Sequence, residues 1–179
     1  MSKYPSQKLT LPDGRNLDYL ISGDQNGFPF VFIHGTPGSF CPIESIVHES
    51  EKKGLKLITL SRAGYGGSTR NIGRRIIDAV NDIKVLLDHL NVKECVVGGW
   101  SGGGPHALGC AARLPGCLAA LCVAGVAPYD AKGLDWLEGQ GQDSKLMRTR
   151  LYCTCLTQLS RHRRDECLLS WRAYYVCLC

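Results

Sequence analysis

The sequence predicts an α/β fold in which helices flank a mostly parallel sheet, because strand-like runs alternate with helix-like segments. Residues 30–33 are apolar on both faces, which is typical of a strand buried inside a parallel sheet. Further strands are expected over 55–60, 94–98 and 118–125. The helix expected over 75–90 carries an apolar stripe formed by Ile76, Val80, Ile83, Leu87 and Leu90. This alternation favours right-handed crossovers and helices on both faces of one sheet.

The remaining segments complete this arrangement up to about residue 141. Alternating residues at 8–11 and 17–21 flank the turn 12–15, which predicts an antiparallel hairpin. Helices are expected over 43–53, ending at Gly54, and over 106–113. We therefore expect residues 1–141 to form the α/β portion and 142–179 to form an irregular tail rich in Cys and Arg. From Arg150 onward the periodicity fits neither strand nor helix for long, so poor packing is expected there.

Composition narrows the classes of function. A chain of 179 residues with 44% hydrophobic content is long enough for one domain with a substantial core. The net charge is +5, but the sequence contains no basic helix interleaved with aromatic residues. No nucleic-acid partner is therefore expected. No apolar run has the length of a membrane span, and no apolar leader opens the chain. We therefore expect no membrane partner and a cytoplasmic location.

The ten cysteines fall into two groups. In a reducing compartment, those scattered through apolar stretches are expected to be small buried residues. These are Cys41, Cys95, Cys110, Cys117 and Cys122. The tail holds the other five, including two pairs separated by one residue, whereas paired zinc ligands are usually two to four residues apart. No metal and no cofactor are therefore expected.

A Gly-x-Ser-x-Gly match at Gly99, Ser101 and Gly103 is the strongest chemical signal in the chain. An apolar strand-like run precedes it and a helix-compatible segment follows, which is the setting of a nucleophile elbow. Residues without Cβ allow the strand and the helix to cross closely. Ser101 is therefore the candidate nucleophile. The alternative is a glycine-rich loop with an incidental serine.

Three motifs in this order resemble the α/β-hydrolase superfamily. They are His34-Gly35-Thr36-Pro37-Gly38, the loop from Ser61 to Ser68, and Gly99 to Gly103. The likeness runs from about residue 9 to about residue 141. It is nearest to the serine esterase and proline-iminopeptidase-like branches. A serine at the elbow argues against the epoxide-hydrolase and dehalogenase branches, which have aspartate there.

The resemblance implies that Ser101 attacks an ester or amide carbonyl of a small molecule and forms an acyl-enzyme. It also implies an oxyanion hole made by the backbone N–H groups of Gly102 and Thr36, since Pro37 has no N–H. His34 is expected to be a structural imidazole that hydrogen-bonds loop backbone. Arg62 is expected either to brace the loops or to be an ordinary surface arginine.

The chain departs from the family after the nucleophile. The family order is serine, then acid, then histidine. Asp130 is a candidate acid, or alternatively a loop aspartate that caps a helix; His162 is the sole histidine of the tail, and His106 is not expected to reach Ser101. The resemblance therefore implies a chain truncated after the nucleophile half.

Three functional interpretations follow from that departure. The first is a serine hydrolase of impaired activity. The second is a catalytically dead fragment that acts as a binding or regulatory module, and the third is a gene product without function. A sheet that lacks its last strands would also expose an apolar edge, through which the chain could associate with itself.

Overall fold

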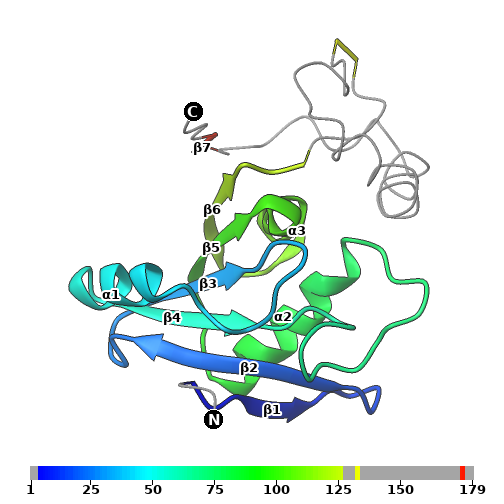
Figure 1. Ribbon diagram of the computed structural model, residues 1–179, viewed down its shortest axis with the longest axis horizontal. Coiled ribbons are helices and arrows are strands. Elements are labelled where there is room, and N and C mark those ends of the chain that lie inside the picture. The colour runs from blue at the N-terminus through cyan, green and yellow to red at the C-terminus, as the bar shows by residue number, and fades with distance from the viewer. Residues whose placement is uncertain (1–3, 127–131, 134–173, 176–179) are drawn as a thin grey trace. The chain divides into compact units, whose positions relative to one another are not determined.

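A computed structural model describes residues 4–126, 132–133 and 174–175 of the chain. Its centre is a twisted sheet with the strand order β1-β2-β4-β3-β5-β6-β7 (Figure 1). The strands span β1 Gln7–Thr10, β2 Asn16–Gly23, β3 Phe28–Ile33, β4 Leu55–Leu60, β5 Cys95–Trp100, β6 Cys117–Val123 and β7 Tyr174–Tyr175. The fold class predicted from the sequence is confirmed.

The sheet is mixed but mostly parallel. The N-terminal hairpin β1–β2 and the pair β2–β4 are antiparallel, as the alternating pattern of these segments predicts. Strands β4, β3, β5 and β6 run parallel to one another, and Phe30 of β3 is in register with Val96 of β5. The carboxyl ends of β3, β4 and β5 consequently meet at one edge of the sheet, where ligands of such folds bind.

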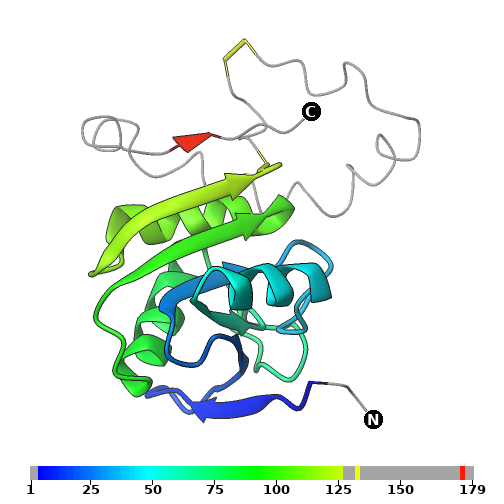
Figure 2. The same cartoon turned by 90° about the vertical axis from the view of Figure 1, so that its left-hand side faces the viewer.

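Helices cover both faces of the sheet, as Figures 1 and 2 show. The helices are α1 Glu44–Lys52, α2 Asp78–His89 and α3 Gly104–Arg113. Helix α1 packs on β2 and β4, whereas α3 packs on β5 and β6 and also contacts α2. A right-handed crossover from β3 to β4 runs in the opposite direction along the sheet to that from β5 to β6. The two crossover helices therefore lie on opposite faces.

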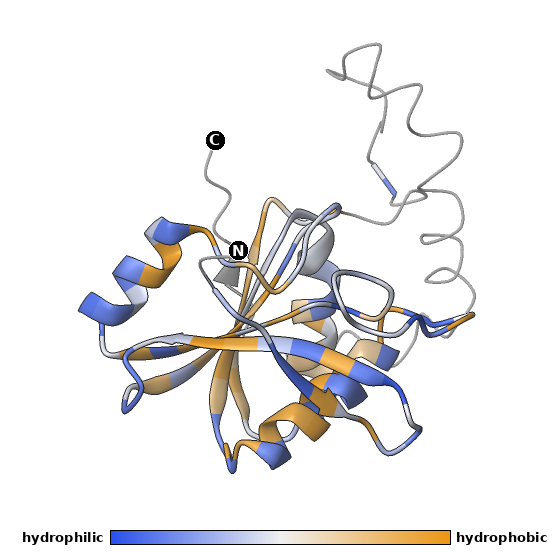
Figure 3. Cartoon of the chain, turned by 60° about the horizontal axis from the view of Figure 1, so that its bottom comes forward, coloured by the Kyte–Doolittle hydropathy of each residue, from blue (hydrophilic) through white to orange (hydrophobic). Residues whose placement is uncertain are grey.

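The hydrophobic core lies between the sheet and the pair α2–α3. Figure 3 shows apolar residues concentrated along the central strands. Val31, Ile33 and Val97 are at most 1% exposed, and they belong to one cluster with Ile83 and Leu86 of α2. The stripe predicted over 75–90 therefore does face the core. Because apolar and exposed residues alternate along α2 with the helical period, only one face of the helix packs against the sheet.

The cysteines of the described region are only partly as expected. Cys95 and Cys110 are buried, and burial raises the pKa of the Cys95 thiol to about 12. Cys117 and Cys122 are half-buried. The expectation for Cys41 is wrong, because Cys41 is exposed in the loop between β3 and α1. Apolar neighbours in the sequence therefore did not mean burial for this cysteine.

An ion pair joins the N-terminal hairpin to α2. Arg15, in the turn after β1, donates from Nη1 to Asp82 Oδ2 over 3.0 Å and from Nη2 to Asp82 Oδ1 over 2.6 Å. Asp82 is 5% exposed, on the buried side of α2. A buried carboxylate needs such a partner, since leaving it unpaired is costly. The pair thus fastens the antiparallel end of the sheet to the helix layer.

Almost all of the predicted tail lies outside the described residues, and so does the expected boundary between residues 141 and 142. The described elements belong to one compact unit, Met1–Gly125 with Arg172–Cys179, and the second unit is Val126–Trp171. Within the tail, β7 pairs in parallel with Leu121 and Cys122 of β6. In the part of the chain that the structure describes, no helix is long and apolar enough to cross a membrane.

Candidate active site

Ser101 lies at a sharp bend between β5 and α3, with a single 3-10 turn over Ser101–Gly103. Its φ is +52°, an uncommon value for a residue with a side chain. A Cβ built on Gly103 would overlap the carbonyl oxygen of Ile33, and a Cβ built on Gly99 would overlap that of Gly103. The strand–turn–helix setting predicted from the sequence is therefore confirmed, together with the steric reason for its glycines.

The loop after β3, residues 34–39, lies directly against this bend. A Cβ built on Gly35 would be 3.3 Å from Ser101 Cβ and 3.7 Å from Ser101 Oγ. A Cβ built on Gly102 would be 2.7 Å from Thr36 Oγ1 and 3.4 Å from Thr36 N. The peptide bond between Thr36 and Pro37 is cis. The structure thus brings the three sequence-predicted site residues, Ser101, Gly102 and Thr36, together at the edge of the sheet.

His34 is a structural imidazole, as predicted. Its Nδ1–H donates to Gly35 O over 2.7 Å, and its Nε2 accepts the backbone N–H of Arg62 over 3.0 Å. Burial, together with the nearby Arg62 charge, lowers the pKa of His34 to about 4. The ring is therefore neutral near pH 7, and its two hydrogen bonds define which nitrogen carries the proton. Both ring nitrogens are committed to the loops rather than to Ser101.

Arg62 ties three segments together. Its Nη2 donates to Gly35 O and to Thr36 Oγ1, both over 2.9 Å. Its guanidinium carbon lies 4.7 Å from the centre of the Tyr65 ring, within range of a cation–π interaction. Only 4% of the residue is exposed. The prediction that Arg62 braces the loops is confirmed, and the alternative of an ordinary surface arginine is wrong.

His106 is the residue of this network that sequence reasoning missed. Its Nδ1 lies 3.0 Å from Ile76 O, and its Nε2 lies 2.9 Å from Arg62 Nη1. Burial and the charge of Arg62 lower its pKa to about 3. The signal was present in the sequence, because His106 shares the buried stripe of α3 with Ala107 and Cys110. A polar ring on an apolar helix face needs hydrogen-bond partners.

Comparison with known proteins shows to which family the chain belongs. The profile described as "alpha/beta hydrolase fold" matches residues 29–158, which is more than half of the chain. The chain belongs to the α/β-hydrolase family.

The relatives of this α/β-hydrolase chain are longer than it is. It is 31% identical over 137 residues to the proline iminopeptidase of Arabidopsis thaliana, covering 74% of this chain and 36% of that protein. It is 30% identical over 134 residues to the uncharacterized hydrolase YcgS of Bacillus subtilis, covering 75% and 44%. The chain thus spans less than half the length of these relatives.

A solved structure supports the fold of this α/β-hydrolase chain. The epoxide hydrolase CorEH superposes with a TM-score of 0.65 at 18% identity, covering 82% of this chain and 50% of that one. At that identity the likeness concerns the fold alone.

No histidine of the described region hydrogen-bonds Ser101 Oγ in this α/β-hydrolase chain. His48 is on the exposed side of α1, and the His89 ring packs edge-on against Tyr19 with 6.4 Å between centroids. Within residues 4–126, Ser101 Oγ has no hydrogen-bond partner. The candidates Asp130 and His162 lie outside the described residues. The catalytic acid and base therefore stay predictions.

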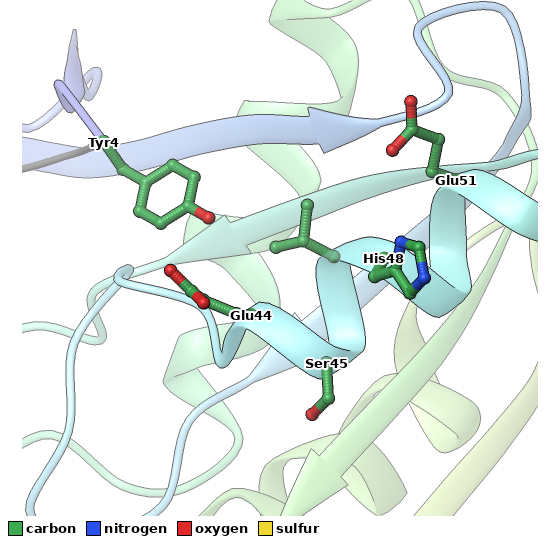
Figure 4. A pocket seen from close by; sticks show the side chains of 6 residues that line it. Tyr4, Glu44, Ser45, His48 and Glu51 are labelled. Carbon is green, nitrogen blue, oxygen red and sulfur yellow. The ribbon is translucent and has the colours of Figure 1, made fainter.

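A pocket of about 450 Å³ lies elsewhere, against α1 (Figure 4). It is lined by Tyr4, Glu44, Ser45, Val47, His48 and Glu51. None of these belongs to the loops around Ser101, so the pocket is no part of the candidate site. Among the described residues, no group of three or more His, Cys, Asp and Glu side chains is placed to hold a metal ion.

Proposed function

We propose that this chain is the nucleophile-bearing portion of a serine hydrolase that cleaves an ester or amide carbonyl of a small molecule through an acyl-enzyme. The observation that carries the proposal is the bend at Ser101, whose φ is +52°, with Gly35 and Thr36 packed against it. Backbone strain of this kind persists where the surrounding structure enforces it, commonly at functional sites. The α/β-hydrolase membership and the proline iminopeptidase among the relatives support the same class of reaction.

In this proposal, Ser101 Oγ forms a bond to the carbonyl carbon of the substrate. The bond from that carbon to the leaving oxygen or nitrogen then breaks, and the serine proton ends on the leaving group. A water molecule then attacks the acyl carbon and gives up a proton. The bond from that carbon to Ser101 Oγ breaks, the proton returns to Oγ, and the carboxylic acid is released. The backbone N–H groups of Gly102 and Thr36 stabilise the negative charge on the carbonyl oxygen. The close approach of Gly102 to Thr36, with 3.4 Å between a Cβ built on Gly102 and Thr36 N, supports this pairing of donors.

We also propose that this chain hydrolyses its substrate slowly, because the sequence shows no recognisable histidine of the kind expected after the acid. A serine hydroxyl without a base is a poor nucleophile at neutral pH. In related chemistry, removal of one member of the triad leaves only the acceleration given by the oxyanion hole and by binding. Turnover of p-nitrophenyl acetate should accordingly be slow. Robust turnover that is lost in both Ser101→Ala and His162→Ala would contradict this and assign the base to His162.

The nucleophile is tested by labelling with a fluorophosphonate probe, followed by mass spectrometry of the modified peptide. Label is expected on Ser101 and is expected to vanish in Ser101→Ala. Ser39→Ala is a matched control, since Ser39 is in the adjacent loop after β3 and should not affect labelling. Equal labelling of wild type and Ser101→Ala would overturn the assignment.

A second candidate function is a binding or regulatory module without catalysis. It applies if neither Asp130 nor His162 acts on Ser101, because Ser101 Oγ has no hydrogen-bond partner within residues 4–126. Cooperative unfolding in urea together with absent labelling would support this candidate over the hydrolase. Absence of cooperative unfolding would contradict both.

A further inference from the structure

We propose that His106 is a positioning residue for the predicted oxyanion hole, and that it acts through Arg62 on the loop at Gly35 and Thr36. This inference rests on the proposed function, because it concerns how the same site holds its geometry. His106 itself does not touch the reacting atoms. Its partners are Ile76 O and Arg62 Nη1, both on the side of α3 that faces the core.

The contacts form a closed path around the elbow. Ser101, Gly102 and His106 are joined covalently through the start of α3. Arg62 Nη1 contacts His106 Nε2 over 2.9 Å, and Arg62 Nη2 reaches Gly35 O and Thr36 Oγ1, each over 2.9 Å. Gly102 lies against Thr36 on the other side. The path therefore begins and ends at the two residues whose N–H groups are the predicted oxyanion donors.

Thr36 depends on this path for its position. The residue is exposed, and its other side-chain contact is with Tyr65 O–H at 3.5 Å, at the outer limit of a hydrogen bond. Pro37, the next residue, has no N–H to add a bond. Arg62 thus makes the shorter of the two hydrogen-bond contacts of Thr36 Oγ1. It shares the restraint of the loop with His34 Nδ1, which bonds Gly35 O, and with Phe40 N, which bonds Ser61 Oγ. Displacement of this loop by a fraction of an ångström would loosen the hole. Preorganised donors lose their effect when they are no longer held in place.

An imidazole suits this role because it carries a donor and an acceptor on one rigid ring. Nδ1–H donates to Ile76 O, which leaves Nε2 bare to accept from Arg62 Nη1. A protonated ring would set N–H against N–H, and burial beside the Arg62 charge keeps the ring neutral. The orientation of the guanidinium fork, and with it the direction of Nη2, is then determined by His106.

The test compares His106→Leu, which removes the acceptor, with His106→Gln, whose amide oxygen replaces it near the Nε2 position. The probe is phenylboronic acid, which adds to a serine and places a tetrahedral anion in the oxyanion hole. Its affinity is measured by calorimetry. His106→Leu is expected to weaken binding about tenfold or more, and His106→Gln to stay within about threefold of wild type. Cys110→Ala, another buried site on α3, should lower the urea midpoint and leave the affinity nearly unchanged.

A second variant covers the case in which His106→Leu fails to fold. In Arg62→Lys, one ammonium group cannot reach His106 and Thr36 at once, so the same loss of affinity is expected. Unchanged affinity in a folded His106→Leu or in Arg62→Lys would overturn the inference. Equal losses in His106→Leu, His106→Gln and Cys110→Ala would also overturn it, because they would indicate a role in packing alone.

A readout independent of chemistry separates this inference from the proposed function. If wild type binds no boronate and takes no fluorophosphonate, the proposed function fails. The amide resonances of Thr36 and Gly102 in the ¹⁵N–¹H spectrum then report on the loop directly. Shifted resonances and faster amide exchange in His106→Leu but not in His106→Gln would support the positioning role, whereas unchanged resonances in His106→Leu would contradict it.

Discussion

At the scale of single residues, the elbow depends on glycines whose hydrogen atoms leave room for backbone. A Cβ on Gly103 would overlap Ile33 O, whereas a Cβ on Gly109 of α3 would meet Val80 Cγ2 at an ordinary 3.5 Å. We expect Gly103→Ala to lower the free energy of unfolding by about 3 kcal/mol, since β3 and α3 must separate. Gly109→Ala should instead raise it by about 0.5–1 kcal/mol through helix propensity. Urea titration of both variants checks this, and equal effects would contradict it.

The buried histidines predict a loss of stability in mild acid. Their pKa values are about 4 for His34 and about 3 for His106 in the folded chain, against 6.5 when exposed. The unfolded chain therefore binds more protons below pH 6.5, and stability falls as the pH is lowered toward those folded values. Between pH 7 and pH 5, protonation of each histidine in the unfolded chain should lower the free energy of unfolding by about 2 kcal/mol.

That loss is measured by urea titration at pH 7 and pH 5. His106→Gln removes one of the two titrating rings and is expected to halve the difference between the two pH values. His48→Gln, at an exposed histidine of α1, should leave the difference as in wild type. A pH dependence that is unchanged in His106→Gln would show that His106 does not contribute.

The site was predictable from the sequence where it depends on local backbone. Ser101 and its glycines form a motif within five residues, and Thr36 follows from the absence of an N–H on Pro37. The hydrogen bonds of Arg62 were not predictable in full, because they form only where the loops after β3 and β4 meet each other and helix α3. Whether a polar residue is buried and satisfied depends on partners far away in the chain, which periodicity does not reveal.

At the scale of elements, the link between the hairpin turn and α2 depends on one carboxylate. Asp82→Ala is expected to lower the free energy of unfolding by about 3 kcal/mol, because it leaves the half-buried Arg15 without its bidentate partner. Asp88→Ala, on the same helix, removes the ion pair with Lys84, whose side chain is 50% exposed. Such exposed pairs contribute less than about 1 kcal/mol. Chemical denaturation distinguishes the two, and similar losses would refute the assignment.

The elements themselves were largely predictable, whereas several of their ends were not. Strand β4 has the predicted bounds, 55–60, because apolar residues and Gly54 mark it clearly. Helix α2 begins at Asp78 rather than at 75, since the Arg75 N–H bonds Asp78 Oδ2 in a turn before the helix. Strand β5 continues to Trp100, beyond the predicted end at 98, because pairing with β6 extends it. Side-chain pattern determines the interior of an element, whereas tertiary hydrogen bonds determine its last residues.

At the scale of the whole molecule, exposed apolar side chains on β6 predict self-association. Leu118 is 59% exposed and Leu121 is 36% exposed. This is unusual for β6, because strands in the parallel part of a sheet are usually covered on both faces. Large apolar side chains exposed on a strand next to the last one of a sheet favour association. Light scattering should show an average mass that rises with protein concentration. Leu121→Lys should suppress this rise.

Ile72 offers a control for that experiment, because it is 87% exposed but lies in the loop between β4 and α2. Ile72→Lys adds the same charge away from the sheet and should not alter the association. An equal effect of Ile72→Lys and Leu121→Lys would attribute the change to net charge instead of to the strand.

The pairing of Phe30 with Val96, between the two strands that carry the site's loops, has a consequence for the time course of folding. The intervening chain, with α1, β4 and α2, must be synthesised before β5 can reach β3. Contacts between distant parts of a chain form slowly, because loop closure costs entropy before the contacts repay it. During synthesis the bend at Ser101 is therefore assembled late. A ribosome-bound chain that stops before β5 would hold the β3 loop without the surface against which it rests.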